Sequence, residues 1–448
     1  MVDRFIATNI APNDFGLFKY YLAIIILLNS ISSFGFSSSI IRYLSINNSH
    51  NVYIFSIIRY TLTKVLVASS LLVLLSHFDF FHALLGIDLN FNVIVFSLFG
   101  YSINSLIVGI YSGLGFLGGK SIINDILGSI LWIAIIYTVS FTDITLGRLC
   151  YIYLAYISLM LFINIIYLSS KGINLLKVFI YKDNIDLTDF KNYSWPIYST
   201  LILVSISMHY DKVILAHFVN DYTLGIYLSA SIIPAFLLTL LTTINFLYLP
   251  LVSFIFSKKK LHKFSLVTAF ITKWISCISF IPSYLLIFHA DEIITLFLSE
   301  EYLIASVSFK ILVFSQYLHL SLGFTGQNIL AMGESKSQMK IKFFTLLLGL
   351  LLGIVFVKEW GIEGIALSVL ISLFLSNIIQ IIFLQAIKKF RLFFQFNYLI
   401  WLINILLISF TYVINFLNGY NSSYFQSTLI LILFVISVLS FKLIGPKD

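Results

Sequence analysis

Charge is scarce in this sequence. Only 10% of its 448 residues are charged and 60% are apolar, whereas soluble domains carry about 25% charged residues. With a mean hydropathy of +1.01, such a chain is typical of a polytopic membrane protein and not of a soluble domain. The net charge of +8 is therefore interpreted through membrane topology, and no nucleic-acid partner is predicted.

Cysteine and catalytic motifs are also scarce. Cys150 and Cys277 lie in separate apolar stretches, which favours inert core residues over a disulfide or a metal site. The sequence has no Walker A loop, no His/Cys metal-ligand spacing and no nucleophile elbow. No loop is long, and the longest covers about 170–193. The sequence therefore predicts no cofactor, no metal, no catalytic residue and no soluble catalytic domain.

Apolar stretches long enough to cross about 30 Å of hydrocarbon dominate the chain. The thirteen predicted spans are 17–38, 60–79, 93–113, 121–141, 148–169, 194–216, 225–255, 265–288, 304–329, 339–357, 363–385, 396–416 and 424–443. The first twelve residues would reach only about 18 Å as a helix. We therefore expect a first helix that is cut short, either truly or by a misplaced start codon.

Basic residues stand in or beside every second loop and include most of the 27 lysines and arginines. Examples are the groups within 171–191, 258–263, 336–342 and 388–391. The loops between them carry acids such as Asp291 and Glu300 and almost no Lys or Arg. By the positive-inside rule, the basic loops and the C-terminus face the cytoplasm.

An internal repeat indicates two related halves. Asp211-Lys212, Asn220-Asp221 and Gly225 follow one another much as Asp3-Arg4, Asn13-Asp14 and Gly16 do, which is typical of a duplicated helical unit. We expect the two copies to be related by a pseudo-twofold axis along the membrane normal, so that superposed halves place Gly16 near Gly225. The predicted parts are an N-lobe 1–169, a cytoplasmic interfacial linker 170–193, a C-lobe 194–385 and two additional C-terminal helices in 386–448.

A few charges lie inside the predicted spans, where each costs roughly 2.5–3.5 kcal/mol. Asp211 and Lys212 are adjacent and cannot share one helix face, so they either tie helices together or belong to a polar pathway. Lys273 and Lys310 have no acid at i±3 or i±4. We expect these lysines, with Arg42 at the cytoplasmic mouth, to line one cavity between the lobes and to bind an anionic head group.

Further polar side chains are candidates for lining the same cavity. Lys64 lies near a span end, where it can instead snorkel to the interface. Asn245, Gln316 and Gln327 offer hydrogen bonds that suit sugar hydroxyls, although such residues also hold helices together.

Several short motifs resemble one family of transporters. They are Asp211-Lys212 with Gly225-Ile226-Tyr227, the stretch Ala331 to Lys336, and the stretch Trp360 to Ala366. Together they resemble the O-antigen and polysaccharide flippases (Wzx-type), in the polysaccharide transporter family of the multidrug/oligosaccharidyl-lipid/polysaccharide (MOP) exporter superfamily. The resemblance implies an all-α fold of two six-helix bundles that form a V, followed here by two additional helices.

The resemblance also implies a function. Members move undecaprenyl-pyrophosphate-linked oligosaccharide units from the cytoplasmic to the periplasmic face of the bacterial inner membrane, for O-antigen, capsular or other surface polysaccharide. We expect a transporter and not an enzyme, with H⁺ or Na⁺ as candidate coupling ion and a polysaccharide polymerase and chain-length regulator as candidate partners. The alternatives are a multidrug/cation antiporter, which would be expected to place acids in its cavity, and a membrane-embedded polymerase, which would need larger outer loops.

Overall fold

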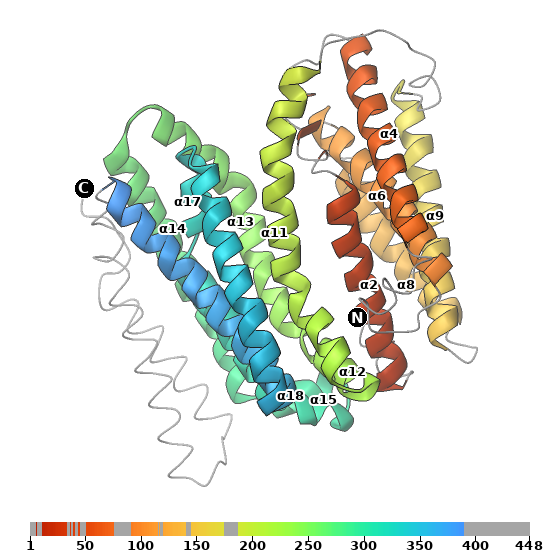
Figure 1. Ribbon diagram of the computed structural model, residues 1–448, viewed down its shortest axis with the longest axis vertical. Coiled ribbons are helices and arrows are strands. Elements are labelled where there is room, and N and C mark those ends of the chain that lie inside the picture. The colour runs from red at the N-terminus through yellow and green to blue at the C-terminus, as the bar shows by residue number, and fades with distance from the viewer. Residues whose placement is uncertain are drawn as a thin grey trace. The chain divides into compact units, whose positions relative to one another are not determined.

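The computed structural model describes helices throughout. It describes residues 6, 11–33, 36, 39–40, 44, 51–75, 91–114, 116, 120–139, 145–173 and 187–388. Every regular element in these ranges is a helix (Figure 1), which confirms the predicted all-α class. Nine helices in the described ranges are long and apolar enough to cross a membrane, so the chain is a multi-pass membrane protein. The predicted spans 396–416 and 424–443, and the incomplete first helix, lie outside the described residues.

The chain divides into two compact units, Met1–Ser229 (unit 1) and Ala230–Asp448 (unit 2). Unit 1 contains α2 (Pro12–Ser32), α4 (Asn51–Leu75), α6 (Phe91–Gly113), the π-helix η1 (Lys120–Leu127), α8 (Gly128–Val139), α9 (Leu146–Ser170), α11 (Thr188–Phe218) and nearly all of α12 (Asp221–Ala230). Unit 2 contains α13 (Ile232–Ser257), α14 (Leu261–Phe288), α15 (Ala290–Phe297), the 3₁₀ helix η2 (Glu300–Ala305), α16 (Ser306–Leu322), α17 (Thr325–Ala331) and α18 (Ser335–Lys388).

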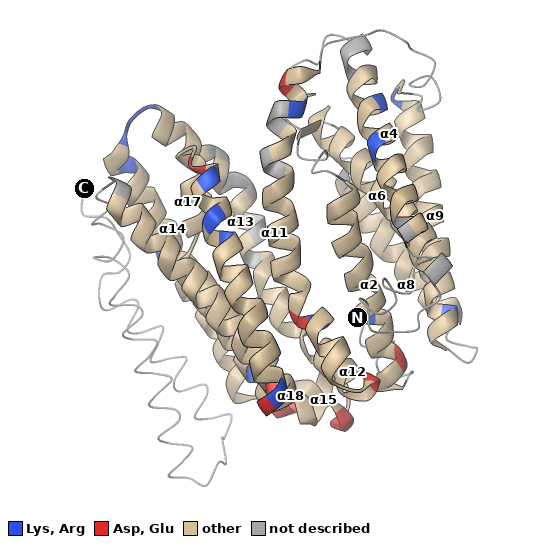
Figure 2. Cartoon of the chain, viewed as in Figure 1, with Lys and Arg blue, Asp and Glu red and all other residues tan. Residues whose placement is uncertain are grey.

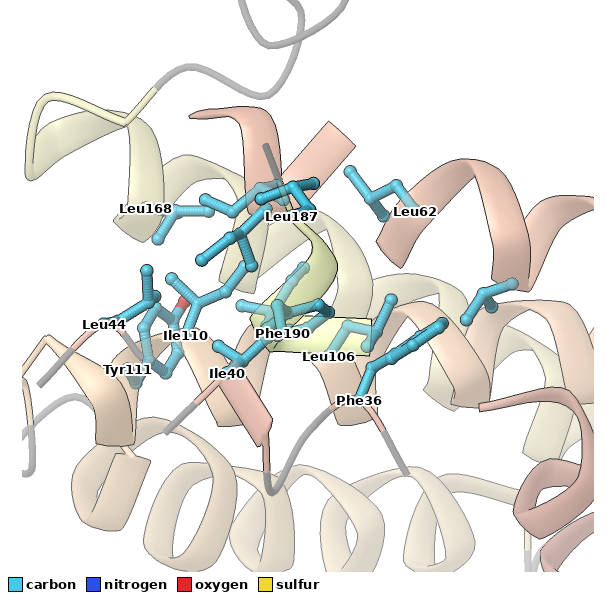
Figure 3. Packing of buried hydrophobic residues seen from close by; sticks show 14 residues of the cluster. Phe36, Ile40, Leu44, Leu62, Leu106, Ile110, Tyr111, Leu168, Leu187 and Phe190 are labelled. Carbon is cyan, nitrogen blue, oxygen red and sulfur yellow. The ribbon is translucent and has the colours of Figure 1, made fainter. Parts of the chain in front are cut away.

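Helix α11 packs with unit 1, although the sequence assigns 194–216 to the second lobe. It begins at Thr188, inside the segment predicted as a surface linker. Phe190 is fully buried and its ring lies 5.9 Å from the ring of Phe36 and 6.2 Å from that of Tyr60. Figure 3 shows Leu187 and Phe190 in the same apolar core as Leu62, Leu106 and Leu168. Because the start of α11 is buried in the core of unit 1, the boundary between unit 1 and unit 2 falls after α11. The predicted lobe boundaries stay predictions.

Two glycines of the internal repeat meet where α2 passes α12. A Cβ atom added to Gly16 would lie 1.9 Å from Gly225 Cα, and one added to Gly225 would lie 2.1 Å from the carbonyl oxygen of Pro12. Only glycine allows two helix backbones to approach so closely. The pseudo-twofold relation of the halves stays a prediction, but the matched glycines are in direct contact.

In unit 2, glycines with positive φ lie where helices end or bend. The predicted spans 339–357 and 363–385 are the two helical halves of α18, which meet at Gly361 with φ 54° and without an intervening loop (Figure 1). A Cβ at Gly364 would lie 2.1 Å from the Phe356 carbonyl oxygen, so this position also needs glycine. The predicted span 304–329 is broken at Gly323, whose φ is 73°, and α17 continues beyond it.

Candidate functional site

The charged pair singled out in the sequence lies where α11 meets α12. Asp211 is buried with 8% of its surface exposed, and its Oδ2 accepts a 3.0 Å hydrogen bond from the hydroxyl of Tyr227. Tyr227 is fully buried on α12. Because this bond joins two helices across the turn at 219–220, Asp211 ties α11 to α12, which is the first of the two expected interpretations.

Lys212 has a different environment from its neighbour. It is half-buried, and its Nζ donates a 3.1 Å hydrogen bond to Nδ1 of His209, one turn earlier on α11. It has no carboxylate within ion-pair distance among the described residues. Lys19 of α2 is close enough for the two ammonium groups to repel each other. We call Lys19, His209, Asp211, Lys212 and Tyr227 the junction cluster.

The junction cluster is suited to hold an anion. The Asp211 carboxylate already accepts a hydrogen bond from the hydroxyl of Tyr227. The ammonium of Lys212 donates a hydrogen bond to the imidazole of His209, which carries no negative charge. The carboxylate of Asp211 also attracts the Lys212 ammonium. A bound anion would add to that attraction, because an ammonium at membrane depth is unfavourable unless negative charge or water compensates it.

Lys273 and Lys310 lie at different levels of unit 2. Lys310 is partly exposed in the second turn of α16, and its Nζ lies 3.8 Å from Oδ1 of Asp291. Lys273 is half-buried on α14, beside Thr272, which touches Gly323 at the other end of α16. This separates the two lysines by about 20 Å along α16. Of these two lysines, Lys310 has an ion-pair partner and Lys273 has none among the described residues.

The remaining predicted residues are scattered. Arg42 lies outside the described residues. Lys64 is exposed on α4, with its Nζ 5.9 Å from the centre of the Tyr60 ring, which agrees with a snorkelling side chain. Asn245 and Gln316 each bury a side-chain oxygen that accepts no hydrogen bond from the described residues, and Gln327 is half-buried on α17. Their expected role in one cavity between the lobes stays a prediction.

Unit 2 also contains a polar network whose connections were not predicted from the sequence. Nδ1 of His319 pairs with the amide nitrogen of Asn377 at 2.9 Å, and the Thr325 hydroxyl donates to Oε1 of Gln380 at 2.6 Å. Lys342 is half-buried and lies within electrostatic reach of His319. The sequence prediction grouped Lys342 with the basic residues in or beside a cytoplasmic loop. Its position two turns inside α18, followed by Phe343 and Phe344, is the signal that could have identified it.

Charged residues of the described helices lie mostly toward the helix ends (Figure 2). Figure 2 shows charged residues gathered toward helix ends in both units and sparse along the middle of the described helices. In unit 2 the turn between α13 and α14 carries Lys258 to Lys260, whereas α15 and η2, beyond the other end of α14, carry Asp291, Glu292, Glu300 and Glu301. The half-buried Lys212, Lys273 and Lys342 are therefore exceptions that need a functional reason.

Comparison with known structures identifies the fold. The chain is similar to an inward-facing multidrug resistance transporter of the MATE family in the MOP superfamily (15% identity, TM-score 0.69, 87% of this chain and 94% of that chain). It is similar to the lipid II flippase MurJ in an inward closed conformation (16% identity, TM-score 0.68, 98% and 94%). A third similar structure is a MOP superfamily transporter from Pyrococcus furiosus (16% identity, TM-score 0.57, 85% and 89%).

Sequence comparison identifies the family. A search of curated proteins found no match. Residues 2–256, which are more than half of the chain, match the family described as polysaccharide biosynthesis protein. The expected resemblance to polysaccharide transporters and the expected MOP fold are thereby confirmed. This chain is a multi-pass membrane protein that belongs to the polysaccharide biosynthesis protein family.

Proposed function

We propose that the chain moves oligosaccharide units linked to undecaprenyl pyrophosphate from the cytoplasmic to the periplasmic face of the bacterial inner membrane. The units would serve O-antigen, capsular or other surface polysaccharide, and the crossing would use alternating access. One observation supports this most strongly: Lys212, Lys273 and Lys342 are half-buried in the spans and have no carboxylate at ion-pair distance among the described residues. A pyrophosphate supplies the missing negative charge.

The membrane potential favours the proposed direction. A pyrophosphate carries about two negative charges, and an inside-negative potential favours outward movement by about 2.3 kcal/mol per charge per 100 mV. The polyprenyl tail can remain in lipid while the head group passes between polar helix faces. Cationic side chains in both units would offer the head group a counter-charge.

The same charges disfavour export of cationic drugs. Among the described residues of the spans, Asp211 is the buried acid, and its carboxylate already accepts a hydrogen bond from Tyr227. A cation would therefore meet ammonium groups instead of free carboxylates. Coupling to H⁺ or Na⁺, association with a polymerase and a chain-length regulator, and a cytoplasmic C-terminus stay predictions.

A reconstituted transport assay tests the proposal. The purified full chain is placed in vesicles of phosphatidylethanolamine and phosphatidylglycerol that contain polyprenyl-pyrophosphate-linked N-acetylglucosamine. A galactosyltransferase added outside the vesicles modifies only the sugar that reaches the outer leaflet. The wild type should expose the inner-leaflet sugar over time. Lys212→Gln, Lys273→Gln and Lys342→Gln should each slow this roughly 10- to 100-fold, because a hydrogen bond to a charged group contributes about 1.5–3 kcal/mol.

Two further lysines separate the alternatives. Lys258→Gln, in the exposed turn after α13, is the matched control and should transport like the wild type. Lys310→Gln tests the expected cavity role against the surface pair with Asp291, which should contribute at most about 1 kcal/mol. If Lys212→Gln, Lys273→Gln and the Lys258→Gln control all transport at the same rate, the cationic pathway is wrong. If the wild type exposes no lipid-linked sugar but exports ethidium, the chain is a cation exporter.

A further inference from the structure

Unit 1 contains a polar cavity that is separate from the junction cluster. Its volume is about 500 Å³, within the range of roughly 300–1,000 Å³ that is usual for small-molecule sites. It lies between α6, η1 and α9, and the polar side chains that line it include Tyr101, Asn104, Ser105, Asn124, Tyr153 and Tyr156. None of its lining residues carries a carboxylate or an ammonium group.

An amide triad holds the three helices around this cavity. The side-chain nitrogen of the fully buried Asn164 on α9 donates to Oδ1 of Asn104 on α6 at 3.0 Å and to Oδ1 of Asn124 on η1 at 3.1 Å. The Tyr111 hydroxyl donates to the backbone oxygen of Asn164 at 2.8 Å. These bonds fix the orientation of Asn104 and Asn124, so that part of the wall is formed before any ligand arrives.

Other groups in the wall lack partners. The hydroxyls of Tyr101, Ser105, Tyr153 and Tyr156 make no hydrogen bond with any described residue. Inside a membrane-spanning unit, polar groups without partners are unfavourable and are satisfied by protein, by water or by a ligand. A cavity with several such groups on different helices can hold a molecule that carries several hydroxyls.

The chemistry of the wall selects an uncharged ligand. A charged group would enter a membrane-embedded cavity without a counter-charge among the lining residues, which costs several kcal/mol. The tyrosine rings offer flat apolar faces, and the amide and hydroxyl groups offer donors and acceptors. A pyranose ring presents the matching surfaces, because its C–H groups form apolar faces and its hydroxyls lie around the rim.

We propose that this cavity binds one or two neutral sugar residues. The inference rests on the proposed function only for the source of the sugar, which would be the lipid-linked unit during its passage. A free neutral glycoside offers the same chemistry, so the experiment below uses both sources. The site would give the transporter a means of sensing the sugar apart from the pyrophosphate.

Trp132 provides a reporter for the cavity. Its ring lies 5.8 Å from the ring of Tyr153 and 5.1 Å from that of Tyr156, so a ligand that contacts these tyrosines should change its emission. The sequence has five tryptophans, and a variant with the other four changed to Phe isolates this signal. The full chain is measured in phosphatidylcholine nanodiscs prepared without glycoside detergents, because such detergents would compete for the site.

The titration compares neutral and charged sugars. N-acetylglucosamine and lactose should change the emission of Trp132 saturably, whereas glucosamine and glucuronate should bind at least 10-fold more weakly. Tyr101→Phe, which removes one hydroxyl from the wall, should weaken binding roughly 2- to 10-fold, since one hydrogen bond contributes about 0.5–1.5 kcal/mol. Tyr151→Phe is the matched control, because Tyr151 is exposed on α9 outside the cavity, and it should leave binding unchanged.

Three outcomes would overturn the inference. An absence of any saturable change would mean that the cavity holds only water, and equal affinities for neutral and charged sugars would remove the argument from the uncharged wall. A response equal in Tyr101→Phe and the wild type would place the binding elsewhere. The comparison of sugars needs no variant, so a folding defect in Tyr101→Phe leaves the test valid.

Lipid-linked sources separate this inference from the proposed function. In the same nanodiscs, polyprenyl-pyrophosphate-linked N-acetylglucosamine should change Trp132 emission, whereas sugar-free polyprenyl pyrophosphate should not. If vesicles show transport of lipid-linked sugar but no sugar alters the Trp132 signal, the cavity assignment is wrong and the proposed function stands. If free sugars bind but no lipid-linked sugar crosses the membrane, the proposed function is wrong and the binding site stands.

Discussion

The contact of α2 with α12 allows a quantitative prediction. Alanine at position 16 would place a Cβ 1.9 Å from Gly225 Cα, whereas ordinary van der Waals contact begins at 3.4 Å. The two backbones would therefore have to separate locally by about 1.5 Å, the difference of these distances. Backbone atoms cannot avoid the clash by changing rotamer, so the helices themselves must move.

The energetic consequence follows from two opposing effects. Overpacking typically costs about 1–3 kcal/mol, and we take the upper value because the contacted atoms are backbone. The higher helix propensity of alanine stabilises the helix by roughly 1 kcal/mol and so offsets part of this cost. Gly16→Ala should therefore lower the free energy of unfolding by about 2 kcal/mol. Gly225→Ala should have a similar effect, since its Cβ would lie 2.1 Å from the Pro12 carbonyl oxygen.

The measurement is an unfolding titration with SDS in mixed micelles, followed by circular dichroism. Gly147→Ala is the matched control, because Gly147 is helical and its added Cβ would meet no atom within 4 Å. The double variant Gly16→Ala/Gly225→Ala should cost less than the sum of the single variants, because one separation of the helices accommodates both methyl groups. The reasoning fails if Gly16→Ala and Gly225→Ala unfold at the same SDS fraction as Gly147→Ala, or if the two effects are additive.

Three other substitutions test single contacts by the same titration. Tyr227→Phe should lower the free energy of unfolding by about 1–3 kcal/mol, because the buried Asp211 loses its hydroxyl donor. Asn164→Leu should cost at least as much, since it leaves the amides of two neighbouring helices without their shared partner. Gly323→Ala should cost more than about 2 kcal/mol. Its φ of 73° with ψ of −155° is a conformation essentially restricted to glycine, which costs other residues about 1–3 kcal/mol, and its Cβ would also lie 2.3 Å from Thr272 Oγ1.

Each of these substitutions has a control in the same unit. Tyr222→Phe removes a hydroxyl from an exposed tyrosine of α12 and should change the free energy by no more than about 0.5 kcal/mol. Ser158→Leu places leucine on an exposed position of α9 and should be equally mild. Gly333→Ala has φ 81° but no atom within 4 Å of the added Cβ, so it measures the backbone cost alone. A control that costs as much as its partner would refute the specific contact.

The helical class and the spans were predictable because they depend on local composition. A run of about 20 apolar residues is visible without knowledge of its neighbours, and the predicted ends near 113, 169, 216 and 288 agree with helices that end at Gly113, Ser170, Phe218 and Phe288. The interruption at Gly361 was predicted as well, because it falls between the predicted spans 339–357 and 363–385. The break inside the predicted span 304–329 was not predicted. Gly323 adopts positive φ there, and sequence alone does not distinguish such a glycine from one that stays helical.

The partners of the charged residues were less predictable because they come from other helices. The argument for Lys310 considered acids only one helical turn away, whereas its partner Asp291 lies on α15. Asp211 similarly takes its hydrogen bond from Tyr227, 16 positions along the chain. Lys342 was counted with the basic residues in or beside a loop, because lysines near span ends usually mark topology. Each case depends on which helices pack together, which one sequence does not reveal.

The reversal of α18 at Gly361 has a consequence for how the chain enters the bilayer during synthesis. Its two halves are joined without a loop. We therefore expect neither half to adopt its final transmembrane position before the other has also inserted. Lys358, Glu359 and Glu363 lie at the bend, and transferring charges through hydrocarbon costs roughly 2.5–3.5 kcal/mol each. The two halves should therefore leave the insertion machinery as one hairpin, with these three charges crossing together in a single event.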